Sequence, residues 1–182
     1  MGMGIMICGL NGAGKSTLGA ALAEKLNLYL IDHETLYFPA TDASNPYAAP
    51  RTHEEVQKIL LQELVAHKDF VFTAVKGNYG EPICSLFQYV VLLHTPKEIR
   101  VQRVKNRSLQ KFGNRIFPGG DLQEQEERFF DFVQSRPEHL VEDWVRTLNG
   151  PILRVDGTAP IEDNVRKITK WIQSKPMYRL SL

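Results

Sequence analysis

One short glycine-rich segment constrains the fold of this chain more than any other part of the sequence. Residues 9–17, GLNGAGKST, match the pattern G-x-x-x-x-G-K-[ST] at every fixed position. The apolar run Ile5–Cys8 comes directly before them and has the character of a buried strand, and the residues from Leu18 to Lys25 have that of a helix. A strand, a glycine loop and a helix in this order are the context in which the pattern forms an anion-binding loop.

The residue types of this loop explain what it can bind. Glycines let the backbone curl so that successive N–H groups point into one concavity, at a helix N-terminus whose dipole favours an anion. The ammonium of Lys15 can reach β- and γ-phosphates, and the hydroxyl of Ser16 can ligate Mg²⁺. The loop therefore predicts a nucleoside triphosphate site, and the residues expected to form it are Gly9, Asn11, Gly12, Ala13, Gly14, Lys15, Ser16 and Thr17.

Composition narrows the class of protein. A chain of 182 residues with 43% hydrophobic and 24% charged residues suits a single domain over 1–182. A net charge of +1 provides no general attraction for nucleic acid, and no apolar run approaches the length of a membrane span. The first residues lead straight into the predicted strand and leave no room for a signal peptide, so we expect a cytoplasmic protein.

Two further compositional features concern cysteines and assembly. Cys8 and Cys84 are too few for a disulfide framework, and Cys8 is expected to act as a small buried apolar side chain. No heptad and no large apolar stripe stands out, which is consistent with a monomer or a weak homodimer.

Short apolar runs recur along the chain with segments of helical length between most of them. These runs are Ile5–Cys8, Leu28–Ile31, Phe70–Ala74, Val90–His94 and Ile152–Val155. Strands that alternate with helices favour a parallel sheet covered on both faces.

Helix starts are also marked in the sequence. Thr52–Glu55 predicts a capping box that opens a helix toward Ala66, and Thr95–Glu98 predicts a second one with Pro96 at the first helical position. Ser135–Glu138 is a third candidate, and the last helix is expected from Pro160 to about Ser174. Two segments rich in Pro or Gly, 33–51 and 108–121, interrupt the alternation; they are either surface loops or functional excursions.

Residues that follow the predicted strands are candidates for a second binding site, because ligands of open parallel sheets bind beyond the carboxyl ends of the strands. Asp32 follows the second strand and can hold the Mg²⁺ water shell, accept a proton from a substrate hydroxyl, or simply cap a helix. His33 and Glu34 beside it are weaker candidates. Gly77 and Asn78 follow the third strand and form either a substrate wall or an ordinary turn.

Arginines provide a further signal. Arg103 and Arg107, with Arg100, share one face of the helix after Thr95, and Arg115 and Arg128 lie in and beyond the 108–121 segment. Cations on and beside such a segment suit phosphoryl transfer, in which catalysis is mostly positioning and charge stabilisation. The alternative is a solvated basic face paired with the acidic residues at 124–127. Arg51, just before a helix start, can clamp a phosphate or carboxylate, or be an ordinary surface residue.

Taken in order, these segments resemble the adenylate kinase-like family of P-loop kinases, which includes the nucleoside monophosphate, shikimate and gluconate kinases. The resemblance implies an α/β, three-layer P-loop NTPase fold with five parallel strands in the order 2-3-1-4-5. It also implies an acceptor-binding segment at 33–66 and a short lid at 108–121. Arg103 would lie against an adenine ring that Asp156, Gly157 and Thr158 flank, and Arg107 would touch the phosphates. Arg115 would lie on the lid and Arg128 on its return helix.

The chain departs from the family's pattern after the third strand. The Asp-Gly-Phe-Pro-Arg signature of adenylate kinases is replaced by Lys76–Gly80, whereas Arg51–Glu54 is similar to an Arg-x-x-Glu element of shikimate-type kinases. The main hypothesis is an ATP- and Mg²⁺-dependent phosphotransferase with a nucleotide-like or otherwise anionic acceptor. One alternative is a kinase for a small hydroxyl compound with Asp32 as base. Another is a P-loop NTPase switch with no second substrate.

Overall fold

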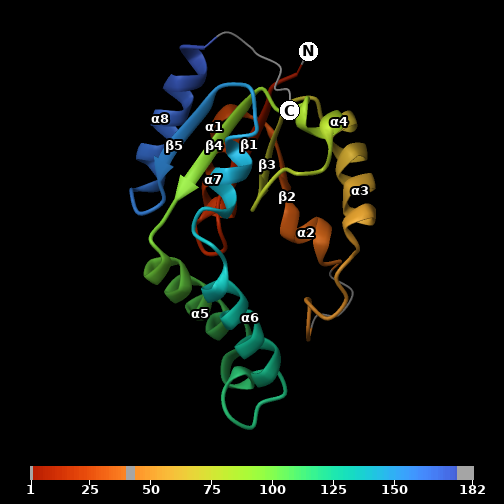
Figure 1. Ribbon diagram of the computed structural model, residues 1–182, viewed down its shortest axis with the longest axis vertical. Coiled ribbons are helices and arrows are strands. Elements are labelled where there is room, and N and C mark those ends of the chain that lie inside the picture. The colour runs from red at the N-terminus through yellow and green to blue at the C-terminus, as the bar shows by residue number, and fades with distance from the viewer. Residues whose placement is uncertain (1, 40–43, 176–182) are drawn as a thin grey trace.

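The computed structural model describes residues 2–39 and 44–175 (Figure 1). Within these ranges the strands are β1 (Gly4–Cys8), β2 (Tyr29–Asp32), β3 (Phe70–Ala74), β4 (Tyr89–His94) and β5 (Ile152–Asp156). The helices are α1 (Lys15–Leu26), α2 (His33–Tyr37), α3 (His53–Ala66), α4 (Glu81–Cys84), α5 (Lys97–Phe112), the 3₁₀ helix η1 (Gly113–Ile116), α6 (Gln123–Ser135), α7 (Leu140–Val145) and α8 (Ile161–Gln173).

The strands of the described chain form one parallel sheet in the order β2-β3-β1-β4-β5, so the expected topology is confirmed. Each predicted run corresponds to a strand, with β3 matching residue for residue and the others shifted or extended by one residue. Because Cys8 pairs with Ala74 and Asp32 pairs with Thr73, the ends of β1, β2 and β3 lie level at one edge. The segments that follow these strands therefore start side by side.

Alternating side chains of the strands supply two hydrophobic cores, one on each face of the sheet. On one face, Met6 and Phe72 pack among residues of α3, α4 and α7, and on the other, Ile5 and Val71 pack among residues of α1 and α8. Figure 1 shows the same layers, with α8 on one side of the sheet and α3 and α4 on the other. The result is the expected three-layer α/β architecture.

The loop between β1 and α1 is held by close backbone packing. Gly12 and Gly14 have φ angles of 78° and 101°, in the left-handed region that favours glycine. A Cβ atom on Gly12 would lie 2.3 Å from the carbonyl oxygen of Arg100, in the first turn of α5. The loop and α5 can therefore approach this closely only because position 12 has no side chain.

Helix starts agree with the sequence in two cases and differ in two. Thr52 caps α3 in the predicted capping box, with its N–H donating to Glu55 Oε2 at 2.8 Å and its Oγ1 accepting from the Glu55 N–H at 3.2 Å. α8 begins after Pro160 as expected. The capping box predicted at Thr95 is wrong, because this buried hydroxyl donates to the Ala13 carbonyl at 3.1 Å and Pro96 precedes the helix. The start predicted at Ser135 is also wrong, because Ser135 ends α6.

Beyond the carboxyl edge of the sheet, α5 and α6 extend away from the core and pack against each other (Figure 1). The predicted lid at 108–121 comprises the last turn of α5, η1 and the connection to α6. The predicted acceptor segment at 33–66 comprises α2, a connection of which residues 40–43 lie outside the described part, and α3. The acceptor segment thus starts at the edge of the sheet where the glycine loop lies, whereas the lid lies at the far end of α5 (Figure 1).

Candidate functional site

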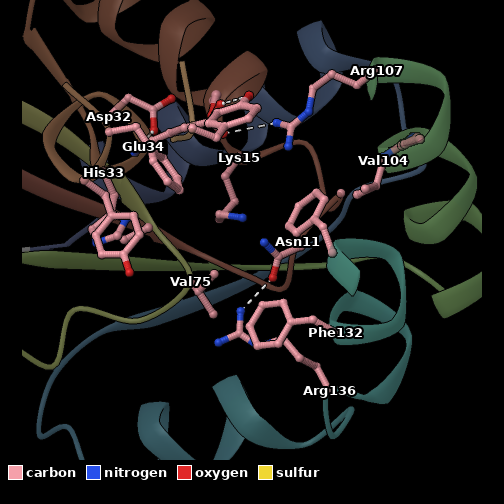
Figure 2. A pocket seen from close by; sticks show the side chains of 18 of the residues that line it. Asn11, Lys15, Asp32, His33, Glu34, Val75, Val104, Arg107, Phe132 and Arg136 are labelled. Carbon is pink, nitrogen blue, oxygen red and sulfur yellow. Dashed lines mark hydrogen bonds and ion pairs between the residues drawn. The ribbon is translucent and has the colours of Figure 1, made fainter. Parts of the chain in front are cut away.

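A cavity of about 830 Å³ lies between the glycine loop, α2 and the α5–α6 pair. Its lining comes from segments far apart in the sequence: Asn11, Gly12, Gly14, Lys15, Ser16, Thr17, Asp32, His33, Glu34, Tyr37, Phe38, Tyr47, Ala48, Ala74, Val75, Lys76, Asn78, Tyr79, Arg103, Val104, Arg107, Gln125, Glu126, Phe129, Phe132 and Arg136. Figure 2 shows Lys15 pointing into this space, with Asp32, Glu34, Asn11 and Arg136 around it.

Lys15 is held in the cavity by the loop itself. Its Nζ donates to the Leu10 carbonyl at 3.1 Å. Burial lowers the pKa of Lys15 from 10.5 to about 8, the Coulomb attraction of Asp32 opposes this shift, and Arg107 adds to it. An anion bound beside the ammonium would raise the pKa again, so the site favours a negatively charged ligand. Gly9 and Ala13 of this loop were expected to bind the ligand but do not line the cavity. The Gly9 N–H donates to Val75 O at 3.3 Å, and Ala13 is 1% exposed.

Arg103 joins the loop to the turn after β5. Its Nη1 donates to the carbonyls of Gly157 at 3.0 Å and Ala13 at 3.3 Å. The Asp156 carboxylate accepts from the Thr158 N–H at 2.8 Å and so closes its own turn, and Asp156 does not line the cavity. The structure therefore brings Arg103 and the backbone of Gly157 to the loop, and their expected place beside an adenine ring stays a prediction.

Asp32 is both a cavity residue and a helix cap. It ends β2, and its Oδ1 accepts from the Glu34 N–H at 3.0 Å at the start of α2. His33 beside it contacts the hydroxyl of Tyr79 through Nε2 at 2.5 Å, and burial lowers the pKa of His33. The helix cap expected at Asp32 is confirmed, and its roles toward Mg²⁺ or a substrate hydroxyl stay predictions, for which Oδ2 is the oxygen that the cap does not use.

Glu34 connects the acceptor segment to α5. Its carboxylate pairs with Arg107 Nη1 at 3.2 Å and accepts from the Tyr47 hydroxyl at 2.7 Å. The Lys111 ammonium donates to the same hydroxyl at 2.9 Å and lies 4.0 Å from the centre of the Tyr47 ring. Burial and the hydrogen bond to Glu34 raise the pKa of Tyr47 above its usual range. Arg107 therefore lines the cavity and pairs there with a carboxylate, and its expected contact with phosphates stays a prediction.

Sequence reasoning missed Arg136, which follows α6. Its Nη1 donates to the Asn11 side-chain oxygen at 2.6 Å, and its guanidinium lies 4.7 Å from the centre of the Phe132 ring (Figure 2). Burial lowers the pKa of Arg136. Its only sequence signal was a basic residue in a segment that we assigned to a helix start. The path of α6 brings it to the glycine loop.

Arg100 is a buried residue that makes structural contacts beside Arg136 and Asn11. It is 1% exposed, its Nε donates to the Thr95 carbonyl at 3.0 Å, and its Nη2 pairs with Glu138 at 2.5 Å. Its Nη1 donates to the backbone carbonyl of Asn11 at 3.4 Å. The loop is thus held from α5 and from the residues after α6 at the same position.

Comparisons with known proteins agree with this geometry. The AAA_18 family, described as an AAA domain, matches residues 5–131, well over half of the chain. The shikimate kinase of Acinetobacter baylyi is 31% identical over 121 residues, which are 60% of this chain and 67% of that enzyme. The cytidylate kinase of Pseudomonas aeruginosa is 35% identical over 79 residues, 43% of this chain and 33% of that enzyme.

The chain belongs to the P-loop kinase family. This P-loop kinase is accordingly an enzyme, a phosphotransferase of the small-molecule type. It is also 27% identical to YqaC of Bacillus subtilis, an uncharacterized protein, over 178 residues that are 93% of this chain and 97% of YqaC.

Solved structures show the same fold at low sequence identity. A deoxyadenosine kinase from M. mycoides is 16% identical with a TM-score of 0.57, covering 95% of this chain and 100% of that one. A shikimate kinase from Acinetobacter baumannii, in complex with shikimate, is 20% identical with a TM-score of 0.53, covering 94% of this chain and 93% of that one.

Two residues that we expected in the acceptor half of the kinase do not line its cavity. The Arg51 Nη1 donates to the Leu36 carbonyl at 2.6 Å, so its guanidinium is used to hold the end of α2. Gly77 faces the core, where an added Cβ would meet Phe87 at 3.0 Å and Trp144 at 3.2 Å. The neighbouring Asn78 does line the cavity.

Two arginines that we expected to be catalytic also lie away from the cavity of the P-loop kinase. Arg115 donates to both carboxylate oxygens of Asp121, at 2.9 and 2.6 Å, and to the Ser44 carbonyl at 2.6 Å. Arg128 lies on the outer face of α6, with its side chain 71% exposed and paired with Glu124 at 3.1 Å. Arg136, which also follows the predicted lid in the sequence, lines the cavity in their place.

Other features of the P-loop kinase bear on the earlier expectations. Cys8 and Cys84 are buried and unbridged, and burial raises the pKa of Cys8 to about 12, which confirms its apolar role. Across the described ranges, no three His, Cys, Asp or Glu side chains are grouped to hold a metal ion. No helix in those ranges has both the length and the apolar character needed to cross a membrane.

Proposed function

We propose that this kinase is ATP-dependent and transfers the γ-phosphoryl group to a small-molecule acceptor that is nucleotide-like or otherwise anionic. One observation carries the proposal. The cavity at the glycine loop continues into a second half lined by α2, residues 47–48 and α6. A nucleotide on the loop would therefore have room for a second ligand beside its terminal phosphate.

Mg²⁺ fits the residues beside Lys15. Ser16 and Asp32 line the same cavity and offer a hydroxyl and a carboxylate oxygen. Mg²⁺ prefers such ligands and completes its shell with water and substrate phosphates, which is consistent with a site that has no cluster of three protein ligands in the described chain. When bound, the ion would neutralise charge that develops on the phosphates.

Three cations are placed to stabilise the transferring group. Lys15 reaches in from the loop, Arg107 from α5 and Arg136 from the residues after α6. Among residues 2–39 and 44–175, Arg107 has one hydrogen-bond partner, Glu34, and Arg136 has one, Asn11. A phosphate can replace either contact with two parallel hydrogen bonds, which favours an anionic ligand between them. Catalysis would then be positioning and charge stabilisation.

The lining of the second half favours a ring-bearing acceptor. The aromatic side chains of Phe38, Tyr47 and Phe129 line it, and an aromatic wall stabilises a planar ligand by stacking. Together with Arg107 and Arg136, these side chains support an acceptor with a ring and a negative charge. A nucleotide has both.

Asp32 supports a second candidate function, a kinase for a hydroxyl-bearing acceptor. Its Oδ1 accepts from Glu34, and Oδ2 is the oxygen that can take the proton of a substrate hydroxyl. In this case the oxygen of the acceptor hydroxyl would attack the γ-phosphorus, its proton would pass to Asp32, and ADP would leave.

A coupled assay of ADP release tests the proposal. Purified protein with ATP and Mg²⁺ is offered nucleoside monophosphates, nucleosides and small hydroxyl compounds in turn. Lys15→Ala should abolish transfer, because the cation at the β- and γ-phosphates is lost. Asp32→Asn should severely reduce turnover with a hydroxyl acceptor and reduce it less with a monophosphate. If no compound exceeds the rate with ATP alone, the enzyme is an NTPase of the switch type and the proposal fails.

A further inference from the structure

Glu126, near the start of α6, has a carboxyl oxygen that is buried without a partner. The residue is 2% exposed and lines the cavity. Its Oε2 has no hydrogen-bond partner within residues 2–39 and 44–175. Because burying a polar atom unpaired costs free energy, such an atom in a binding cavity marks a place where a ligand can supply the missing hydrogen bond.

The polar side chains on either side of Glu126 do have partners. The amide of Gln125 bonds to Asn45 across the cavity rim, at 3.0 Å. The carboxylate of Glu127 accepts from Gln123 Nε2 at 2.9 Å on the outer face of the helix. Gln125 also lines the cavity, so in this turn of α6 the unpaired oxygen distinguishes Glu126 even from a neighbour on the same cavity wall.

Two of the cations that line the cavity, Arg107 and Arg136, are engaged by other groups. Arg107 pairs with Glu34 at 3.2 Å, and Arg136 donates to Asn11 at 2.6 Å. Neither contact involves Glu126, and no group in the described part of the chain pairs with Oε2, so a ligand that enters the cavity can supply the partner. A carboxylate only accepts hydrogen bonds, so this partner must present an N–H or O–H group.

Neighbouring side chains place Glu126 in the acceptor half. Phe38, Tyr47 and Phe129 line the same cavity, and the negative charge of Glu126 is among the causes that raise the pKa of Tyr47. Gln125, the preceding residue, bonds to Asn45 of the acceptor segment. Glu126 thus lines the cavity next to a residue that bonds to the acceptor segment, and in the company of three aromatic lining residues.

We propose that Glu126 determines acceptor specificity by accepting a hydrogen bond from an amino or hydroxyl group on the acceptor's ring. This inference rests on the proposed function, because it concerns the second ligand of that cavity. A ring carbonyl in the same place would set two acceptor atoms against each other, and the site would reject it. The ligand class is thus narrowed to rings that carry a hydrogen-bond donor.

Equilibrium binding of three probes tests the inference. Cytidine and uridine 5′-monophosphates differ at ring position 4, an amino group in cytosine and a carbonyl in uracil, and at N3, an acceptor in cytosine and an N–H donor in uracil. Shikimate carries hydroxyl groups on a ring without an amino group. Each is titrated by calorimetry into the full chain with ADP present, which supplies no phosphoryl group for transfer. The variants are Glu126→Gln, Glu126→Asp and the control Glu127→Gln, a neighbouring exposed residue outside the lining.

If the donor is an amino group, the wild-type protein should bind cytidine monophosphate about tenfold or more tightly than uridine monophosphate. Glu126→Gln should remove most of this preference, because an amide can present either its oxygen or its NH₂ to the ring. If the donor is a hydroxyl, Glu126→Gln should weaken shikimate binding about tenfold instead. Glu126→Asp, which keeps the acceptor oxygens, should recover part of the loss, and Glu127→Gln should match the wild type.

The inference is overturned if no probe binds, or if Glu126→Gln leaves all three affinities within about twofold of the wild type. It is also overturned if Glu126→Gln lowers the unfolding temperature and weakens the binding of ADP as much as the binding of the probes. A purely structural role of Glu126 would give this result. Transfer from ATP to each bound probe is measured separately. A probe that depends on Glu126 for binding and is never phosphorylated contradicts the proposed function and leaves the assignment of Glu126 in place.

Discussion

Replacing Lys15 by methionine should stabilise the protein while it abolishes phosphoryl transfer. Burial lowers the pKa of Lys15 from 10.5 to about 8, so at pH 7 the folded protein carries this ammonium at a cost. At about 1.4 kcal/mol per pKa unit, the cost is about 3 kcal/mol. The hydrogen bond from Nζ to Leu10 O offsets about 1 kcal/mol of it. Lys15→Met should therefore raise the free energy of unfolding by about 2 kcal/mol at pH 7.

The direction of the pKa shift determines how the stability difference between the two proteins changes with pH. The pKa of Lys15 is lower in the folded than in the unfolded state, so between pH 8 and 10.5 the unfolded chain binds more protons. The penalty in the wild-type protein is therefore full below pH 8 and disappears as the pH rises through this window. By pH 10 the contribution of this charge to the difference in free energy of unfolding between the variant and the wild type should fall from about 3 to about 1 kcal/mol. Cys8 and Tyr79, whose pKa values burial raises to about 12, are present in both proteins and cancel.

Urea unfolding followed by tryptophan fluorescence, without nucleotide, measures the difference at pH 7 and pH 10. Lys25→Met is the matched control, because Lys25 lies on the same helix and is exposed. It should change the free energy of unfolding by no more than about 0.5 kcal/mol. The reasoning is refuted if Lys15→Met is no more stable than the wild type at pH 7, or if its gain does not shrink at pH 10.

Three more predictions concern other residues. Arg136→Ala should lower kcat/KM about 100-fold or more, because a cation that faces the transferring phosphate is lost. The control Arg128→Ala should keep a kcat/KM close to that of the wild type, and equal losses in the two variants would contradict the placement of these arginines. Thr52→Ala should reduce the free energy of unfolding by about 1 kcal/mol through loss of the capping box, and an unchanged urea midpoint would count against it. Cys8 should resist a thiol reagent at pH 8 in the folded protein and react in urea, because burial raises its pKa to about 12; rapid labelling of the folded state would show otherwise.

Local patterns in the sequence were enough to predict much of the fold. The strands β1 and β3 are continuous apolar runs because both faces of the sheet are covered, and this makes them visible without a structure. The glycine loop and the capping box at Thr52 are local motifs, whose geometry depends on residues a few positions apart. Thr95 has the same local pattern, yet its hydroxyl is used by Ala13 across the fold, a contact that no local pattern contains.

The candidate site depended more on tertiary structure. Arg103 and Arg107 share a helix face that is set by local spacing, so they could be predicted to act together. Arg136 meets Asn11 only because α6 returns along the cavity, and their positions are 125 residues apart in the chain. Glu126 lies in a run of acidic and amide residues that resembles a solvated helix face. Its burial depends on how α6 packs against α5 and η1, which the sequence pattern does not reveal.

The close approach of Gly12 to Arg100 has a consequence for how this protein tolerates mutation. A methyl group at position 12 would lie 2.3 Å from the backbone oxygen of Arg100, which no side-chain rotation can relieve. In a saturation mutagenesis screen for activity, position 12 should therefore be as intolerant of replacement as Lys15. The causes differ, because Lys15 is needed for its charge and Gly12 for the space in front of it. Suppressors of a Gly12 substitution would have to move the first turn of α5.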